Sequence, residues 1–203
     1  RLGDAGVRVL AKALLADAAP PSLRALALRH NNVGDDGARA LSDGLRVAGA
    51  PPLRALDLGW NAIGTRGGRY LGDAVAANVS LAELHLPWNG LADRGARALG
   101  DALPTNGALA ALDLGHNAIG DGGGRALARG ARSNGVLRRL VVDDNGLSAG
   151  VADDVAAAVA AAAPVDGGGG GGEAPASRPA ARQPRYEAAD DEEIEEISMD
   201  DED

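Results

Sequence analysis

The chain has 203 residues, no Cys, no Phe and a formal net charge of −9 that is unevenly distributed. Residues 1–163 hold 17 Arg plus Lys against 16 Asp plus Glu, whereas residues 164–203 hold 3 against 13. The near-neutral first part lacks the basic surface that nucleic-acid binding requires, and the absence of Cys excludes disulfides and thiolate chemistry. The longest apolar run, 155–165, is about half of the roughly 20 residues that a membrane helix needs, so we expect no membrane span.

A motif of the form L-x-x-L-x-L-x-x-N recurs five times along the chain. Its copies begin at Leu23, Leu53, Leu81, Leu109 and Leu137. The first two copies are 30 residues apart and the others follow every 28, with Pro20-Pro21 and Pro51-Pro52 in the loops that lengthen the first interval. A fixed period of this kind predicts a solenoid of 28–31-residue repeats, because each unit buries its apolar face only against its neighbours.

Within each repeat, the L-x-L segment predicts a short strand whose leucines point inward by period-two alternation. The Asn that follows can turn inward and bond the backbone of the bend, which has no other partner there. We therefore interpret the Asn column as a structural ladder. Its members are Asn31, Asn61, Asn89, Asn117 and Asn145.

A helix of about ten residues is expected after each strand, beginning at a Gly-Asp-x-Gly pattern. We expect the Asp at this start, for example Asp35 and Asp121, to be the N-cap of its own helix, with Thr65 in that place in the second copy. Leucines spaced by a repeat then form the buried stripe of an amphipathic helix. The stripe contains Leu10, Leu41, Leu71, Leu99 and Leu127. The predicted fold is an α/β leucine-rich-repeat solenoid, a right-handed β/α horseshoe with a parallel inner sheet and outer helices.

The two ends of the chain differ from the repeats between them. Residues 1–6 match the second half of a repeat, so we expect an N-terminally truncated solenoid with more repeats upstream. Residues 148–163 predict a final helix that closes the core through Val151, Val155 and Val159. Beyond it we predict a disordered Gly/Pro/Ala-rich linker over 164–186 and a disordered acidic tail over 187–203, and we assign 1–163 to the solenoid.

The repeat pattern closely resembles the ribonuclease-inhibitor subfamily of leucine-rich repeats. The resemblance includes the second Asn column, Asn78, Asn106 and Asn134, three residues before the next strand Leu, and covers about residues 1–160. It implies binding through the concave face and its loops. Repeats of this subfamily followed by an acidic tail also resemble Ran GTPase-activating protein in architecture, which implies regulation of a small GTPase without catalysis by the chain itself.

Two columns of variable positions should lie on the concave face. One is inside L-x-L and contains Asp57, His85 and Asp113, and the other precedes each Asn and contains His30, Trp60, Trp88 and His116. Because parallel strands lie about 4.8 Å apart, Trp60 and Trp88 should stack side by side at the edge of that face. Two Trp within a polar rim are typical of a protein-binding hot spot, although they could also only cover the sheet edge.

Metal binding and catalysis are disfavoured by the spacing of the same residues. His30 and His116 lie three repeats apart, about 14 Å at the strand spacing, whereas zinc needs its nitrogens about 2 Å from one point. Asp57 and Asp113 are about 10 Å apart, and no nucleophile and base converge. We therefore expect no cofactor, no metal and no enzymatic activity.

Two charged features are expected to lie outside the concave face. Arg8, Arg39, Arg69, Arg97 and Arg125 form a column on the helices, and three of them precede Asp43, Asp73 and Asp101 by four residues, which favours a solvated convex face. A docking strip for the acidic tail or an acidic partner is the alternative. In the tail, Ser198 before a run of acids is a possible phosphorylation site for an acidophilic kinase.

The sequence favours a non-enzymatic scaffold that binds a protein partner on the concave face. The alternatives are a small-GTPase regulator and the sensor repeats of a nucleotide-binding leucine-rich-repeat receptor, whose nucleotide-binding domain would lie upstream. The absence of cysteines leaves the compartment open, and we expect a cytoplasmic protein, with the nucleus as a second compartment. The oligomeric state is not predicted.

Overall fold

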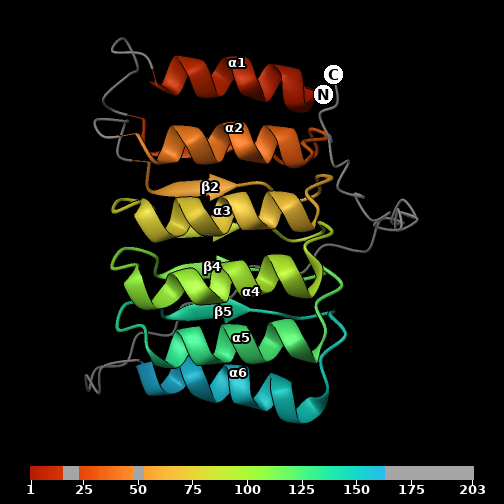
Figure 1. Ribbon diagram of the computed structural model, residues 1–203, viewed down its shortest axis with the longest axis vertical. Coiled ribbons are helices and arrows are strands. Elements are labelled where there is room, and N and C mark those ends of the chain that lie inside the picture. The colour runs from red at the N-terminus through yellow and green to blue at the C-terminus, as the bar shows by residue number, and fades with distance from the viewer. Residues whose placement is uncertain (16–22, 48–52, 163–203) are drawn as a thin grey trace, which may run out of the picture. The chain divides into compact units, whose positions relative to one another are not determined.

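The computed structural model describes residues 1–15, 23–47 and 53–162, over which helices and short strands alternate (Figure 1). The helices are α1 (Gly3–Leu15), α2 (Asp35–Leu45), α3 (Thr65–Ala77), α4 (Ala92–Ala102), the 3-10 helix η1 (Leu103–Thr105), α5 (Asp121–Arg132) and α6 (Ala149–Ala162). The strands are β1 (Ala25–Ala27), β2 (Ala55–Asp57), β3 (Glu83–His85), β4 (Ala111–Asp113) and β5 (Arg139–Val141).

The five strands form one parallel sheet in the order β1-β2-β3-β4-β5. Each strand pairs with the next at equivalent repeat positions, so Leu56 aligns with Leu84 and Leu84 with Leu112. The strands begin one residue before the predicted L-x-L segments. This sheet, with one helix between successive strands, confirms the predicted α/β leucine-rich-repeat solenoid.

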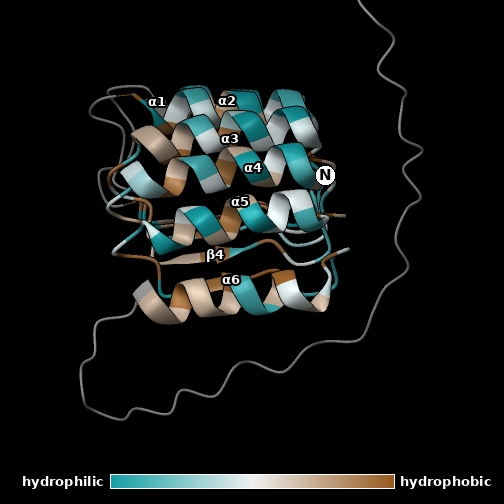
Figure 2. Cartoon of the chain, turned by 60° about the horizontal axis from the view of Figure 1, so that its bottom comes forward, coloured by the Kyte–Doolittle hydropathy of each residue, from teal (hydrophilic) through white to brown (hydrophobic). Residues whose placement is uncertain are grey.

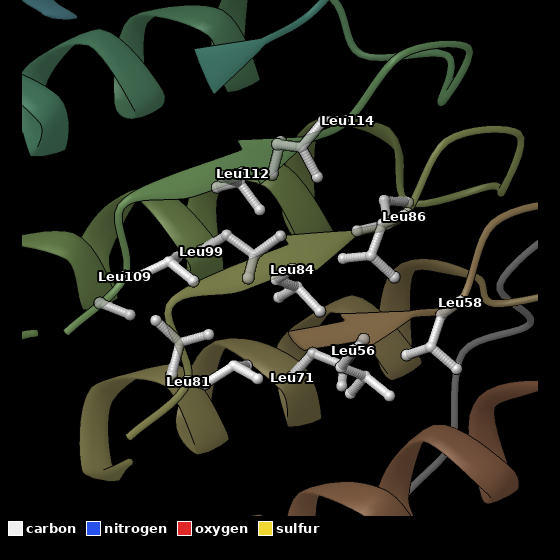
Figure 3. Close-up of a cluster of buried hydrophobic side chains, with 14 of the residues drawn as sticks. Leu56, Leu58, Leu71, Leu81, Leu84, Leu86, Leu99, Leu109, Leu112 and Leu114 are labelled. Atoms are coloured by element: carbon white, nitrogen blue, oxygen red, sulfur yellow. The ribbon is translucent and has the colours of Figure 1, made fainter. Parts of the chain in front are cut away.

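Leucines from the strands and the helices fill the space between the two layers (Figure 3). Leu56, Leu84 and Leu112 of the strands and Leu71 and Leu99 of the helices are all buried. Burying one such side chain stabilises the fold by roughly 1.5–3 kcal/mol, so a three-residue strand persists because its neighbours cover it. Leu10, at the first position of the predicted helix stripe, is only half-buried.

The predicted role of the aspartates at the helix starts is wrong. The N-cap residues of α2 and α5 are Gly34 and Gly120, and neither helix start has a side-chain cap from its own N-cap residue. Asp35 instead accepts hydrogen bonds from the N–H groups of Gly64 (2.7 Å) and Gly67 (2.8 Å), which start the next helix. Because a carboxylate stabilises free N–H groups at any helix N-terminus it reaches, each Asp serves the following repeat.

The same inter-repeat bond recurs along the stack. Gly34 N–H donates to Asp4 at 2.6 Å, Gly120 N–H donates to Asp93 at 2.6 Å, and Ser148 N–H donates to Asp121 at 2.7 Å. The Ser148 hydroxyl also donates to Asp121 (2.9 Å), and the two bonds from Ser148 hold the pKa of Asp121 below its ordinary value. The second repeat has Thr65 in place of Asp, and its hydroxyl donates to the carbonyl oxygen of Leu91 (3.3 Å).

The helices pack against one another with almost no space between their backbones. A Cβ added at Gly100 of α4 would lie 2.7 Å from the carbonyl carbon and oxygen of Ala126 in α5. One added at Gly130 of α5 would overlap the carbonyl oxygen of Gly100. Contacts this close are open only to glycine, so glycine at these two positions sets the distance between α4 and α5.

Helix α6 ends the described part of the chain and differs from the other helices in polarity. Figure 2 shows it mostly pale or brown, with a teal stretch, whereas α1 to α5 carry more teal. Val151 and Val155 are buried and Val159 packs against the core, while Asp153 and Asp154 are exposed, as predicted. The predicted linker (164–186) and acidic tail (187–203), including Ser198, lie outside the described residues. Within those residues, no helix is long and apolar enough to span a membrane.

Candidate binding face

The side chains that alternate with the buried leucines form a column on the face of the sheet opposite the helices, here called the open face. Ala27, Asp57, His85, Asp113 and Val141 align along it, one from each strand. Asp57, His85 and Asp113 are therefore brought together as neighbours on β2, β3 and β4. Their side chains are 25%, 31% and 26% exposed, so they can be reached from solvent.

His85 lies among carboxylates. Its Nδ1 is 3.9 Å from Oδ2 of Asp113 and its Nε2 is 3.6 Å from Oε2 of Glu83 on the same strand. The interaction with the Asp113 carboxylate is the main cause of a raised pKa of His85, and burial opposes it. Burial also disfavours the ionised form of Asp113, but the nearby His85 and the hydrogen bond from Gly115 N–H outweigh it and lower the pKa of Asp113.

A second column follows the strands and consists of stacked rings. Trp60 and Trp88 stack with ring centroids 4.2 Å apart and an interplanar angle of 15°, as the repeat spacing predicted. The stack continues at both ends, because His30 lies 5.1 Å from Trp60 and His116 lies 3.7 Å from Trp88. The four rings His30, Trp60, Trp88 and His116 are called the ring stack below. At its end, Nε2 of His116 is 2.9 Å from Oδ2 of Asp144.

Every residue of this column has a left-handed backbone. The φ angles of Trp60 and Trp88 are 57° and 59°, and those of His30, His116 and Asp144 lie between 54° and 57°. A left-handed conformation costs an L-residue roughly 1–2 kcal/mol, and it is especially uncommon for a bulky side chain. The same conformation recurs at this position in all five repeats, whatever the side chain, so it belongs to the turn that follows each strand, and it directs these side chains away from the core.

The Asn column lies directly behind the ring stack and fixes its backbone. Asn117 is fully buried, and its amide donates to the carbonyl oxygens of Leu86 (2.8 Å), Leu114 (3.1 Å) and Gly115 (3.1 Å). Asn61, Asn89 and Asn145 make equivalent bonds. Each amide bridges its own repeat to the preceding one, which holds the left-handed residue before it in place.

Sequence reasoning missed two charged residues of the open face. Arg29 Nη1 is 3.4 Å from Oδ2 of Asp57, and Glu83 contacts His85. Glu83 stands at the first residue of β3, two positions before His85, so period-two alternation within the strand could have placed it on the same face. Arg29 is two residues after Ala27 and could have been found in the same way.

No group of three or more His, Asp or Glu side chains that could hold a metal ion is present among residues 1–15, 23–47 and 53–162. His85 belongs to the strand column and His30 and His116 to opposite ends of the ring stack, so the three histidines do not meet. The arrangement offers a row of ring edges beside a charged column. It is suited to contact with another molecule.

The Arg column of the helices is exposed, but its predicted ion pairs do not form. Arg39, Arg69 and Arg97 make no ion pair with the Asp four residues later in the described part of the chain, and Asp101 pairs with Arg129 of the next helix (3.2 Å). Arg125 pairs with Asp121 instead (3.2 Å). Because these pairs are exposed to solvent, they contribute little to stability.

Comparisons with known proteins agree with this architecture. A family model described as a leucine-rich repeat matches residues 19–42, 49–72, 77–100 and 109–128. Among solved structures, the tropomodulin C-terminal domain of Caenorhabditis elegans has a TM-score of 0.62 at 16% identity, covering 77% of this chain and 92% of that one. A leiomodin-1 structure described as actin-binding site 2 has a TM-score of 0.61 at 16% identity, with 75% and 86% covered.

No curated protein matches the sequence. At 16% identity, the two solved structures establish a shared fold and nothing about binding residues. The repeat motif, the five-stranded parallel sheet and the family match show that the chain contains leucine-rich repeats.

Proposed function

We propose that the chain is a non-enzymatic binding module that holds a protein partner on the open face of its sheet. The observation that carries the proposal is the pair of stacked tryptophans, Trp60 and Trp88. They are the only two Trp in the chain, both are partly exposed, and both occupy a strained backbone position. Trp is enriched in binding hot spots, and the equivalent positions of other repeats hold His or Asp, so the fold does not require an indole there.

The neighbouring column supports the same proposal. Asp57, His85 and Asp113 are partly exposed and would surround an apolar centre with polar groups, which is the usual composition of a protein interface. The leucine-rich-repeat fold presents its parallel sheet as one continuous surface, and repeat folds commonly use such surfaces for binding.

The test is affinity capture with the full chain and a Trp60→Asn/Trp88→Asn variant. Asn tolerates the left-handed backbone, so the change removes the rings without adding strain. The control variant, Val9→Ser/Val79→Ser, removes two side chains that are 70% and 90% exposed and lie away from the open face. A partner lost from the first variant and kept by the control supports the proposal. An unchanged set of partners contradicts it.

Actin is the first defined partner to test, because the leiomodin-1 structure is described as an actin-binding site. Co-sedimentation with actin filaments and binding to actin monomers can be measured with the same three proteins. Neither solved structure is described as a GTPase regulator, so they give no support to the resemblance to Ran GTPase-activating protein. The small-GTPase and receptor-sensor alternatives stay predictions, as does the cytoplasmic or nuclear location.

A further inference from the structure

The ring stack limits how a partner can touch the two tryptophans. One face of Trp60 is covered by His30 and the other by Trp88, and Trp88 is likewise covered by Trp60 and His116. A cation binds an indole over its face, so it cannot do so here, and an aromatic ring of a partner can meet the indoles only by placing its own face against their edges. Only the ring edges remain, and these carry the positive end of the ring quadrupole together with the indole N–H groups.

Both indole N–H groups are free donors. Within the described residues the backbone N–H groups of Trp60 and Trp88 donate to Pro87 and Gly115, but neither indole N–H makes a hydrogen bond. Neither group is sealed from solvent, because the described residues contain no buried side-chain nitrogen or oxygen without a partner. Water therefore satisfies them in the free protein. A partner that covers the rings displaces this water, and leaving the donors unpaired would cost about 1–3 kcal/mol each.

The partner must therefore bring hydrogen-bond acceptors to the ring edges, and the neighbouring column restricts their charge. Asp57 and Asp113 stand three residues before Trp60 and His116, His85 lies between them on β3, and Glu83 is two residues before His85 on that strand. Arg29 and Arg139 lie near Asp57 and Asp113, and Asp144 adds a carboxylate at the end of the ring stack, so acids outnumber arginines four to two. Carboxylate acceptors on the partner would face these like charges, which is unfavourable in a partly desolvated interface. Neutral carbonyl oxygens avoid the repulsion, and basic side chains beside them would gain from the same column.

The common backbone conformations differ in whether their carbonyls are available. The carbonyls of a helix interior are occupied by its own hydrogen bonds. A partner strand cannot be added at β2, β3 or β4, because each is paired on both sides. A polyproline II segment has no internal hydrogen bonds, leaves its carbonyls open and, when rich in proline, brings few N–H groups that need acceptors.

We propose that the ring stack binds a proline-rich segment of a partner in the polyproline II conformation, with its main-chain carbonyls accepting from the N–H groups of Trp60 and Trp88. The segment carries basic rather than acidic residues, which face Asp57, Glu83 and Asp113. This inference rests on the proposed binding function of the open face, and it adds the chemistry of the partner.

The experiment titrates the ¹⁵N-labelled full chain with three capped peptides. The first has the sequence PPPRPPPRPPP, the second replaces both Arg with Glu, and the third replaces every Pro of the first with alternating Gly and Ser. The two indole N–H signals are assigned with Trp60→Phe and Trp88→Phe variants. We expect both signals to shift downfield and saturate with the first peptide, and the Glu and Gly/Ser peptides to bind at least tenfold more weakly.

The Trp60→Phe/Trp88→Phe variant isolates the hydrogen bonds, because Phe keeps a ring in the stack and lacks the N–H donor. Losing two neutral hydrogen bonds should weaken the first peptide roughly tenfold. Equal binding of wild type and this variant would overturn the inference, as would unshifted indole signals at millimolar peptide or equal binding of the Glu peptide. If the peptide fails while Trp60→Asn/Trp88→Asn still loses a captured partner, the inference fails and the proposed function stands.

Discussion

On the helical side of the repeats, neighbouring backbones approach so closely that Gly100 and Gly130 have no room for a methyl group. On the open face of the sheet, equivalent positions hold side chains as different as those of Ala27, Asp57 and His85. The helical side is thus specified by the contact between repeats, whereas the open face is free of that constraint. Changes on the first should alter stability, and changes on the second should alter binding.

The largest effect is expected at the contact between α4 and α5. Gly100→Ala places a Cβ against the backbone of Ala126, so the helices must move apart, and we expect a loss of about 2–4 kcal/mol in the free energy of unfolding. Urea denaturation followed by circular dichroism measures it. The matched control is Gly107→Ala, where nothing lies within 4 Å of the added Cβ, and it should change stability by less than about 0.5 kcal/mol.

Substitutions in the Asn ladder should cause the second-largest loss in the free energy of unfolding. Asn117→Ala removes three hydrogen bonds from a buried site, while the carbonyl oxygens of Leu86, Leu114 and Gly115 each keep a second donor, and we expect a loss of about 2 kcal/mol in the free energy of unfolding. Asn31, at the first repeat, is less buried and donates to the carbonyl of Arg29 alone, so Asn31→Ala should cost only about 1 kcal/mol. Equal losses in the two variants would show that burial does not set the strength of the ladder.

The aspartates that serve the next helix give a smaller effect. Asp35→Ala removes the acceptor of Gly64 and Gly67, and we expect a loss of about 1–2 kcal/mol, as for a lost helix cap. The neighbouring Asp36 is exposed, so Asp36→Ala should change stability by a few tenths of a kcal/mol. Comparing the thermal unfolding of the Asp35→Ala and Asp36→Ala variants distinguishes the loss of the specific hydrogen bonds from a general effect of removing a charge near the helix start.

Substitutions in the ring stack should abolish partner binding and leave the free energy of unfolding nearly unchanged. Trp60→Asn/Trp88→Asn loses the ring contacts, worth about 0.5–1.5 kcal/mol each, and relieves strain of about 1–2 kcal/mol at each position. We expect the free energy of unfolding to stay within about 1 kcal/mol of wild type while partner binding is lost. A large loss of stability would assign the tryptophans to the fold rather than to binding.

The smallest effect concerns the charge of His85. Because its pKa is raised in the folded state, the folded state binds the proton more tightly, and the resulting stabilisation is present at low pH and lost as pH rises through that raised pKa. Nuclear magnetic resonance titration should place the His85 midpoint above the ordinary value for histidine. Asp113→Asn should lower the midpoint, because it removes the main cause of the shift. An unchanged midpoint would exclude the Asp113 contact as that cause.

Features that depend on the repeat period were predictable from sequence. The sheet register, the burial of Leu84 and Leu112, and the stacking of Trp60 on Trp88 follow from placing equivalent residues on adjacent strands. The use of Asp35 was mispredicted because helix capping is usually a local interaction, and the acceptor here serves residues about 30 positions later. The left-handed backbone of the ring stack could not be inferred, since Trp is an uncommon residue in that conformation.

The contact of Asp93 with Gly120 is repeated by that of Asp121 with Ser148, so these two units, like those that contain Asp4 and Asp35, offer their successors the same attachment point. Single repeats can therefore be added or removed without changing the contacts within the other repeats. A tandem duplication of residues 93–120 would insert one complete unit with an attachment point at each end, and it would lengthen the protein by one increment while leaving the flanking units as they are. A protein of this kind can be made longer or shorter in whole steps.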